Sequence, residues 1–266
     1  MSNLPTVSVI IPAKNEASNL ELVLPKLPAH YEIVLADAGS VDDTVAVTRR
    51  SCPDALIVQQ TRKGKGNALA CGFLAAGGDI IVMFDADCSA DPAEIPTFVQ
   101  TLVDGADFAK GSRFAAGGGS DDITGLRSLG NRGLNLVANI GFGTRFTDLC
   151  YGYNAFWRDL VPVLALPDID GAAPRGDMLW GDGFEIETVI NCRFAAADVR
   201  IVEVPSVEKE RAFGESNLRT FSDGFRVLRT IVGEYRRARS APPVPHRELL
   251  TRRDDLIRRV ETTLAA

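Results

Sequence analysis

Hydrophobic residues in the first part of the chain come in short, nearly uninterrupted runs, at 6–12, 32–36, 55–59, 79–84 and 107–112. Segments with the spacing of amphipathic helices separate these runs, at 17–26, 42–50, 65–76 and 93–103. Strands that are apolar on both faces are typical of parallel sheets covered by helices on both sides. The pattern therefore predicts an α/β fold with a mostly parallel sheet sandwiched by helices.

The pattern changes after residue 113. The stretch AAGGGSDD (115–122) is so rich in glycine that we expect a mobile loop. The spacing then predicts helices and strands in alternation, with a helix at 126–140, a strand-like stretch at 147–160, a loop at 168–183, a helix at 184–196 and a strand at 200–205. An amphipathic helix is expected at 218–239, followed by a linker (240–246) and a charged helix (247–264).

Composition excludes several functional classes. Apolar residues make up 45% of the 266 residues, which is enough for a large core, and the net charge of −6 argues against a nucleic-acid partner. The five cysteines are scattered without a C-x-x-C pair, which indicates reduced thiols in a cytoplasmic protein rather than disulfides or a zinc site. We find no signal-peptide pattern and no apolar run near the roughly 18–20 residues that span a bilayer.

The fourth apolar run ends in two aspartates, Asp85 and Asp87, in the stretch IIVMFDADCSADP. Ligands of open α/β sheets bind at the carboxyl ends of the strands. Two carboxylates about 4–5 Å apart there repel by roughly 3–4 kcal/mol, so either one is protonated or a cation lies between them. Mg²⁺ or Mn²⁺ suits such a pair, because these ions take one or two protein carboxylates and complete their shell with water and phosphate oxygens. The alternative is an acidic capping turn before Pro92.

Three other segments are expected at the same edge of the sheet. PAKNEA (12–17) places polar side chains where a base and ribose can lie, or else it simply begins a helix. Asp37 in LADAGSVDDT ends the second run and can accept from a ribose or base, or else serve a turn. In RKGKGNAL, backbone N–H groups at a helix start, together with Lys63 and Lys65, suit diphosphate oxygens, although the Walker A pattern is absent.

In this order and spacing, VSVIIPAKNEASNL, DAGSVDDT, RKGKGNAL and DIIVMFDADCSADP resemble the nucleotide-sugar half of family 2 glycosyltransferases with the GT-A fold. The later stretches AKGSRF, NRGLNLVAN, FTDLCYGYNAFWRD, GFEIETVI and VPSVEKERAFGESNL are similar to the dolichyl- or polyprenyl-phosphate hexose (mannose) synthase branch. The resemblance spans about residues 6–235, and glucosyl-phosphoglycerate synthases also resemble the first half. It implies a Rossmann-like GT-A fold with a nucleotide-sugar half (1–113), an acceptor half with a lid loop and an amphipathic helix (114–239), and a linker with a C-terminal helix (240–266).

The resemblance also implies a UDP-sugar or GDP-sugar donor, Mg²⁺ or Mn²⁺ on Asp85, Asp87 and Ser89, and a polyprenyl-phosphate acceptor. The residues expected for nucleotide-sugar binding, from the motifs and the resemblance together, are Pro12, Ala13, Lys14, Glu16, Asp37, Lys63, Lys65, Asp85, Ala86, Asp87, Arg113, Arg132 and Arg211. Two positions depart from the family pattern. Ala38 replaces the second acid of Asp-Asp-Gly-Ser, which leaves UDP and GDP open, and Asn217 replaces a lysine of the lipid-phosphate enzymes, for which Arg219 can substitute.

Family resemblance implies inversion at the anomeric carbon by direct displacement. The transition state is oxocarbenium-like with charge leaving on the diphosphate, so Asp87 with its cation and Arg211 as a closing lid are the expected catalytic groups. A hydroxyl acceptor, on a soluble small molecule or saccharide, requires a base, for which Asp182, Glu185 and Glu187 are candidates. A lipid phosphate is already ionised and requires none.

The amphipathic segment 218–239 either packs on the main domain or lies on an anionic membrane, so the protein is expected in the cytoplasm, peripheral at the inner face of the cell membrane. A homodimer is also expected. Two alternatives of other classes are a non-catalytic nucleotide-sugar binding protein and a haloacid-dehalogenase-type phosphatase. VMFDADCS resembles the nucleophile strand of those phosphatases, but three strands precede it here.

Overall fold

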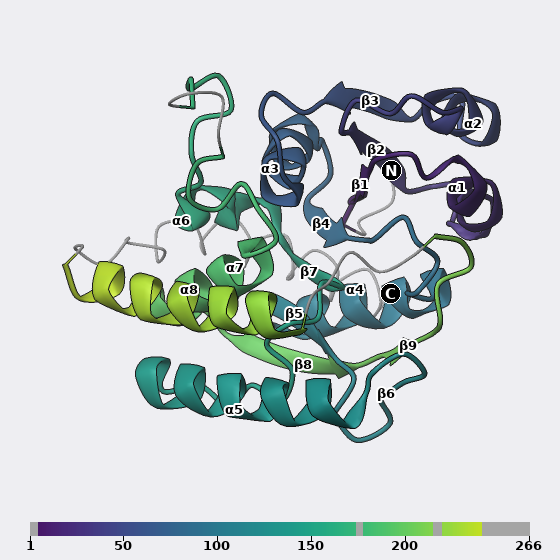
Figure 1. Ribbon diagram of the computed structural model, residues 1–266. Helices are drawn as coiled ribbons and strands as arrows, with labels where there is room; N and C mark the ends of the chain where they lie inside the picture. The colour runs from purple at the N-terminus through teal and green to yellow at the C-terminus, as the bar shows by residue number, and fades with distance from the viewer. Residues whose placement is uncertain (1–4, 174–177, 215–219, 241–266) are drawn as a thin grey trace, which may run out of the picture.

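The computed structural model describes residues 5–173, 178–214 and 220–240 (Figure 1). Their centre is a seven-stranded sheet in the order β3-β2-β1-β4-β7-β5-β8. Six of its strands run in one direction and only β7 is antiparallel, between β4 and β5. The strands are β1 (Val7–Ala13), β2 (Glu32–Asp37), β3 (Leu56–Gln59), β4 (Ile80–Met83), β5 (Phe108–Ser112), β7 (Asn154–Trp157) and β8 (Ile201–Pro205). The predicted mostly parallel sheet is confirmed.

Helices flank this sheet (Figure 1). Helix α3 packs on β1, β2 and β3, whereas α4 packs on β5, β7 and β8, and α5, α7 and α8 pack on one another. The α-helices are α1 (Ala17–Val23), α2 (Thr44–Ser51), α3 (Lys65–Ala75), α4 (Ile95–Val103), α5 (Gly125–Phe142), α6 (Val161–Leu164), α7 (Ile186–Ala196) and α8 (Thr220–Ser240). Short 3₁₀ turns in the described part of the chain are η1 (Leu24–Lys26), η2 (Pro92–Glu94) and η3 (Arg158–Leu160).

Local chemistry explains where the long helix α5 begins and ends. The Thr124 side chain accepts a hydrogen bond from the Arg127 N–H at 3.3 Å, which satisfies one of the free donors of the first turn. At the other end Gly143 adopts a left-handed φ of 70°, the conformation that commonly terminates helices. The inner side of α5 joins Ile231 of α8 and Leu149 in a small second core. α5 and α8 are therefore held together at their inner faces.

The glycine-rich stretch 115–122 was expected to be a mobile loop, but two of its residues form a strand. Its residues Gly119–Ser120 form β6, which pairs in parallel with β9 (Val207–Glu208). The Ser120 hydroxyl also donates to the Glu208 carboxylate at 2.5 Å. A partner far along the chain thus orders a segment that lacks local packing of its own.

Other expectations concern the strand within 147–160, the C-terminal segments and membrane spans. The strand expected within 147–160 is limited to β7, since Thr147 and Asp148 instead donate backbone N–H groups to Glu203. Asn217, Arg219, residues 241–246 of the linker and the helix at 247–264 lie outside the described residues. Across the described ranges, the helices are too short or too polar to cross a membrane.

Candidate functional site

A cavity of about 620 Å³ opens at the carboxyl edge of the sheet. Because β1, β2 and β4 are parallel neighbours, their ends bring together Pro12, Ala38 and the Asp85–Asp87 turn, all from different parts of the chain. The far wall of the cavity comes from α5 and α8. This is the edge at which open α/β sheets bind ligands.

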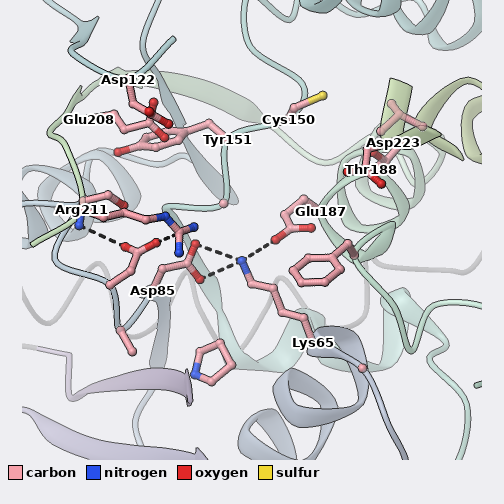
Figure 2. Close-up of a pocket in the computed structure, with 18 of the residues that line it drawn as sticks. Lys65, Asp85, Asp122, Cys150, Tyr151, Glu187, Thr188, Glu208, Arg211 and Asp223 are labelled. Atoms are coloured by element: carbon pink, nitrogen blue, oxygen red, sulfur yellow. Dashed lines mark hydrogen bonds and ion pairs between the residues drawn. The ribbon is translucent and has the colours of Figure 1, made fainter. Parts of the chain in front are cut away.

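Lys65 lies between two carboxylates in this cavity (Figure 2). Its Nζ is 2.7 Å from Asp85 Oδ1 and 2.7 Å from Glu187 Oε1. Burial alone lowers the pKa of Lys65, but the negative charges of Asp85 and Glu187 outweigh burial and raise the pKa above its ordinary value. Lys65 is therefore a firmly held cation that joins the first turn of α3 to the end of β4 and to α7.

Asp87 is paired with Arg211, whose Nη2 lies 2.8 Å from Asp87 Oδ2. The other carboxylate oxygen of Asp87 accepts the Ser89 N–H at 3.0 Å. The segment after β9 that carries Arg211 is fixed at two points. The Lys209 N–H donates to the Ser89 carbonyl at 2.8 Å, and the Phe213 N–H donates to the Asn19 side chain at 3.1 Å. This segment passes over the acidic turn and holds Arg211 against it.

The acidic turn carries excess negative charge. Burial raises the pKa of the nearby Glu16, and although Asn19 and Arg211 oppose the shift, the charges of Asp87 and Asp85 raise this pKa further. Two cavity-facing carboxylates with a third close by fit a hard divalent cation, which needs only one or two protein carboxylates. No cluster of three or more metal-ligating acidic, histidine or cysteine side chains occurs within the described ranges, so such an ion would complete its shell with other oxygens.

Arg113 occupies another part of the cavity, within a dense ionic network. It donates to Asp148 through Nε at 2.7 Å and through Nη2 at 2.9 Å, and to Glu208 through Nη1 at 3.0 Å. Its guanidinium also lies 4.9 Å from the ring centre of Tyr151. Although burial raises the pKa of Asp148, Arg113 overrides this and holds the pKa below its usual range. The arrangement fixes Arg113 and leaves it little freedom to move.

The start of α3 was expected to offer backbone N–H groups to a diphosphate, and this is wrong for two of them. The N–H groups of Gly66 and Asn67 both donate to the Asp182 carbonyl, at 2.7 and 3.1 Å. Gly64 permits the close approach, since it has a φ of +113° and an added Cβ would lie 2.1 Å from that same carbonyl oxygen. The side chains of Lys63 and Lys65 still line the cavity.

Most of the residues predicted for the site meet in this one cavity. Those that line it are Pro12, Ala13, Lys14, Glu16, Lys63, Lys65, Asp85, Ala86, Asp87, Ser89, Arg113, Glu187 and Arg211. Four others do not line it, namely Asp37, Arg132, Asp182 and Glu185.

Each of these four residues has a structural reason for its position. Asp37 is buried, accepting from Gln59 Nε2 at 2.9 Å, and Asp182 is held by Arg62 at 2.7 Å. Glu185 accepts the backbone N–H groups of Gly181 and Gly183, which precede α7. Arg132 is exposed on α5.

Sequence reasoning missed two arginines in the cavity, Arg127 of α5 and Arg226 of α8. Arg127 is five residues before the predicted Arg132, which corresponds to about 140° around a helix axis. Only one of the two can therefore face the cavity, and the buried positions Asn131, Asn135 and Ala138 identify the inner side. Helical phase relative to the core was the signal that could have located Arg127.

Comparison with known proteins identifies the family. A profile described as Glycosyl transferase family 2 matches residues 8–162. The dolichol-phosphate mannosyltransferase of Pyrococcus furiosus is 31% identical over 225 residues, which are 80% of this chain and 59% of that protein. The chain thus spans little more than half the length of this archaeal relative. The undecaprenyl-phosphate mannosyltransferase of Micrococcus luteus is 32% identical over 222 residues, 80% of this chain and 87% of the relative.

A solved structure agrees with the architecture. Glucosyl-3-phosphoglycerate synthase from Mycobacterium tuberculosis, crystallised with Mn²⁺, UDP-glucose and phosphoglyceric acid, superposes with a TM-score of 0.65 and 24% identity. The superposition covers 87% of this chain and 80% of that chain, and it confirms the GT-A fold. Since the family profile covers more than half of the chain and both mannosyltransferases exceed 30% identity over 80% of it, the protein belongs to glycosyl transferase family 2.

Proposed function

We propose that the protein transfers a hexose from a UDP-sugar or GDP-sugar to a polyprenyl phosphate, with inversion and with the help of a divalent cation. The observation that carries the proposal is the pair Asp85 and Asp87, which face a cavity of about 620 Å³ next to the cations Lys65 and Arg211. Family membership favours transfer over the phosphatase and binding-protein alternatives. Two relatives with lipid phosphates in their names support the acceptor class.

In this proposal residues 1–113 bind the donor. Pro12, Ala13 and Glu16 border the part of the cavity where a base and ribose fit, beside Ala38. Lys63 and Lys65 lie on the same wall and supply positive charge for the diphosphate. The proposal includes both UDP-sugars and GDP-sugars, because the Ala38 side chain has no polar group that could distinguish uracil from guanine by a hydrogen bond.

Asp85, Asp87 and Ser89 would hold Mg²⁺ or Mn²⁺. When bound, the ion supplies Lewis-acid stabilisation of the charge that develops on the leaving diphosphate. Arg211 pairs with Asp87 and lies within the cavity wall. We propose that its guanidinium turns from Asp87 to the donor phosphates, which suit its planar arrangement of donors.

In this proposal residues 114–239 bind the acceptor. Arg127 and Arg226 line the cavity between α5 and α8, where an acceptor phosphate can be bound by planar guanidinium groups. Such an acceptor is already ionised and needs no base. If the acceptor is a hydroxyl instead, Glu187 is the base that geometry favours, because Asp182 is buried against Arg62 and Glu185 accepts backbone N–H groups.

The proposal is tested by donor turnover with purified full-length protein. UDP- and GDP-hexoses are incubated with and without Mn²⁺, with undecaprenyl phosphate in detergent or with phosphoglycerate as a soluble acceptor. We expect Mn²⁺-dependent transfer to the lipid phosphate, and a loss of kcat of about 10²–10³ in Asp87→Asn. Asp198→Asn, an exposed acid outside the cavity, is the matched control and is expected to retain full activity. Transfer that persists without divalent cations, or in Asp87→Asn, contradicts the proposed role of the acidic pair.

A further inference from the structure

An apolar stripe runs along the outer side of α5. Its members are large aliphatic side chains with exposed fractions from 38% to 76%, namely Leu126, Leu129, Leu136, Val137 and Ile140. Their spacing matches one side of a helix, opposite the buried positions Asn131, Asn135 and Ala138. A water-facing helix side is normally polar, and an exposed apolar stripe of this kind marks a contact surface. We call these five residues the α5 stripe.

Helix α8 also exposes large apolar side chains. It lies beside α5 (Figure 1) and exposes Phe225, Leu228 and Val232. Phe225 has an exposed fraction of 70%, whereas Ile231 of the same helix is buried. Both helices also line the mouth of the cavity, through Arg127 and Arg226 among others. The two helices that carry the exposed apolar side chains therefore also border the candidate site.

The charge of these two helices is opposite to that of the protein. α5 and α8 together contain seven arginines against two acids, Asp223 and Glu234, whereas the whole chain carries a net charge of −6. Asp223 offsets one of the seven arginines, whereas Glu234 is paired with an arginine outside the two helices. Glu234 is buried against Arg193, and Asp223 is paired with Arg226 at 2.8 Å. Exposed Arg132 lies on the outer side of α5.

From this arrangement we infer that the α5 stripe and the adjoining residues of α8 dock on an anionic lipid bilayer, with the cavity mouth facing the headgroups. The apolar side chains enter the boundary between headgroups and acyl chains, while the surrounding arginines contact lipid phosphates. A second copy of the chain fits less well, because a symmetric contact would bring the same arginines of both copies together. The inference deepens the proposed function, since a polyprenyl phosphate is presented by a bilayer.

The test is co-sedimentation of the full-length protein with phosphatidylcholine vesicles, with and without phosphatidylglycerol. We expect binding that requires phosphatidylglycerol and weakens with salt. The double variant Leu129→Gln/Leu136→Gln should bind at least about tenfold more weakly. Leu74→Gln is the matched control, because Leu74 is exposed to 63% on α3, away from the cavity and the stripe. Arg132→Gln should weaken binding to the vesicles that contain phosphatidylglycerol, and exposed Arg49→Gln should leave it unchanged.

Three results would overturn the inference. One is the absence of vesicle binding, or binding that the double leucine variant retains in full. Another is a dimer, measured by light scattering, that the double variant dissociates, because the stripe would then be a self-association surface. The third is a large fall in Tm of the double variant, which would mean that the chain itself covers the stripe. Mn²⁺-dependent hydrolysis of the donor in vesicle-free solution, measured in parallel, reports on the proposed transferase separately.

Discussion

Replacing Lys65 by methionine tests the central feature of the site, which is one cation shared by two carboxylates. Asp85 Oδ1 and Glu187 Oε1 each lie 2.7 Å from Lys65 Nζ, so these oxygens can be at most about 5.4 Å apart. At an effective dielectric near 20, two unit charges at that distance repel by about 3 kcal/mol. In Lys65→Met the repulsion is no longer compensated, whereas the methionine keeps most of the apolar stem.

We expect Lys65→Met to lower the free energy of unfolding by about 3 kcal/mol, or the Tm by roughly 6–12 °C for a chain of this size. Urea unfolding at neutral pH, followed by circular dichroism, measures the change. Adding Glu187→Gln removes one of the two charges, so the double variant should recover most of the loss. Lys26→Met, at an exposed position, is the control and should remain within about 0.5 kcal/mol of wild type.

A divalent cation adds a second readout to the same experiment. Mn²⁺ can occupy the space next to Asp85 only in competition with Lys65, so it should raise the Tm of Lys65→Met more than that of wild type. The reasoning is refuted if Lys65→Met is as stable as wild type, or if Glu187→Gln fails to recover stability in the double variant. Either result would mean that Lys65 does not neutralise the two carboxylates.

Two further predictions concern charges at the edge of the site and behind α8. Glu16→Gln should raise the Tm by about 2–4 °C near pH 7, because the raised pKa of Glu16 means that its ionised form destabilises the native chain. The gain should vanish below about pH 4, where wild-type Glu16 is protonated as well, and a gain that is constant with pH would contradict this origin. Arg193→Met should lower the free energy of unfolding by about 3–5 kcal/mol, because it removes the arginine that neutralises the buried carboxylate of Glu234. Arg193 Nη2 lies 2.9 Å from Glu234 Oε1. Adding Glu234→Gln should restore part of that loss in urea unfolding, and no restoration would mean that packing rather than charge holds α8.

The mostly parallel sheet, though not the order of its strands, could be expected from the sequence, because a buried parallel strand must be apolar on both faces. The runs at 32–36 and 79–84 became β2 and β4, and their polar ends met at one edge as parallel pairing requires. The acidic pair at the end of β4 could be located for the same reason. The apolar strands and the acidic pair that follows β4 each involve residues close together in the chain. The local pattern of apolar and polar residues therefore predicts them.

The sequence by itself determined the sheet, its ligand-binding edge and the residue types gathered there. Only the tertiary structure decided which of those residues face the cavity. Asp182 was a candidate base, yet its carboxylate is held by Arg62 and its carbonyl takes two N–H groups of α3. Arg127 rather than Arg132 reaches the cavity, because packing against α7 and α8 fixes the rotation of α5. The direction in which each of these side chains points depends on contacts with residues far away in the sequence. A local pattern of residues does not encode those contacts.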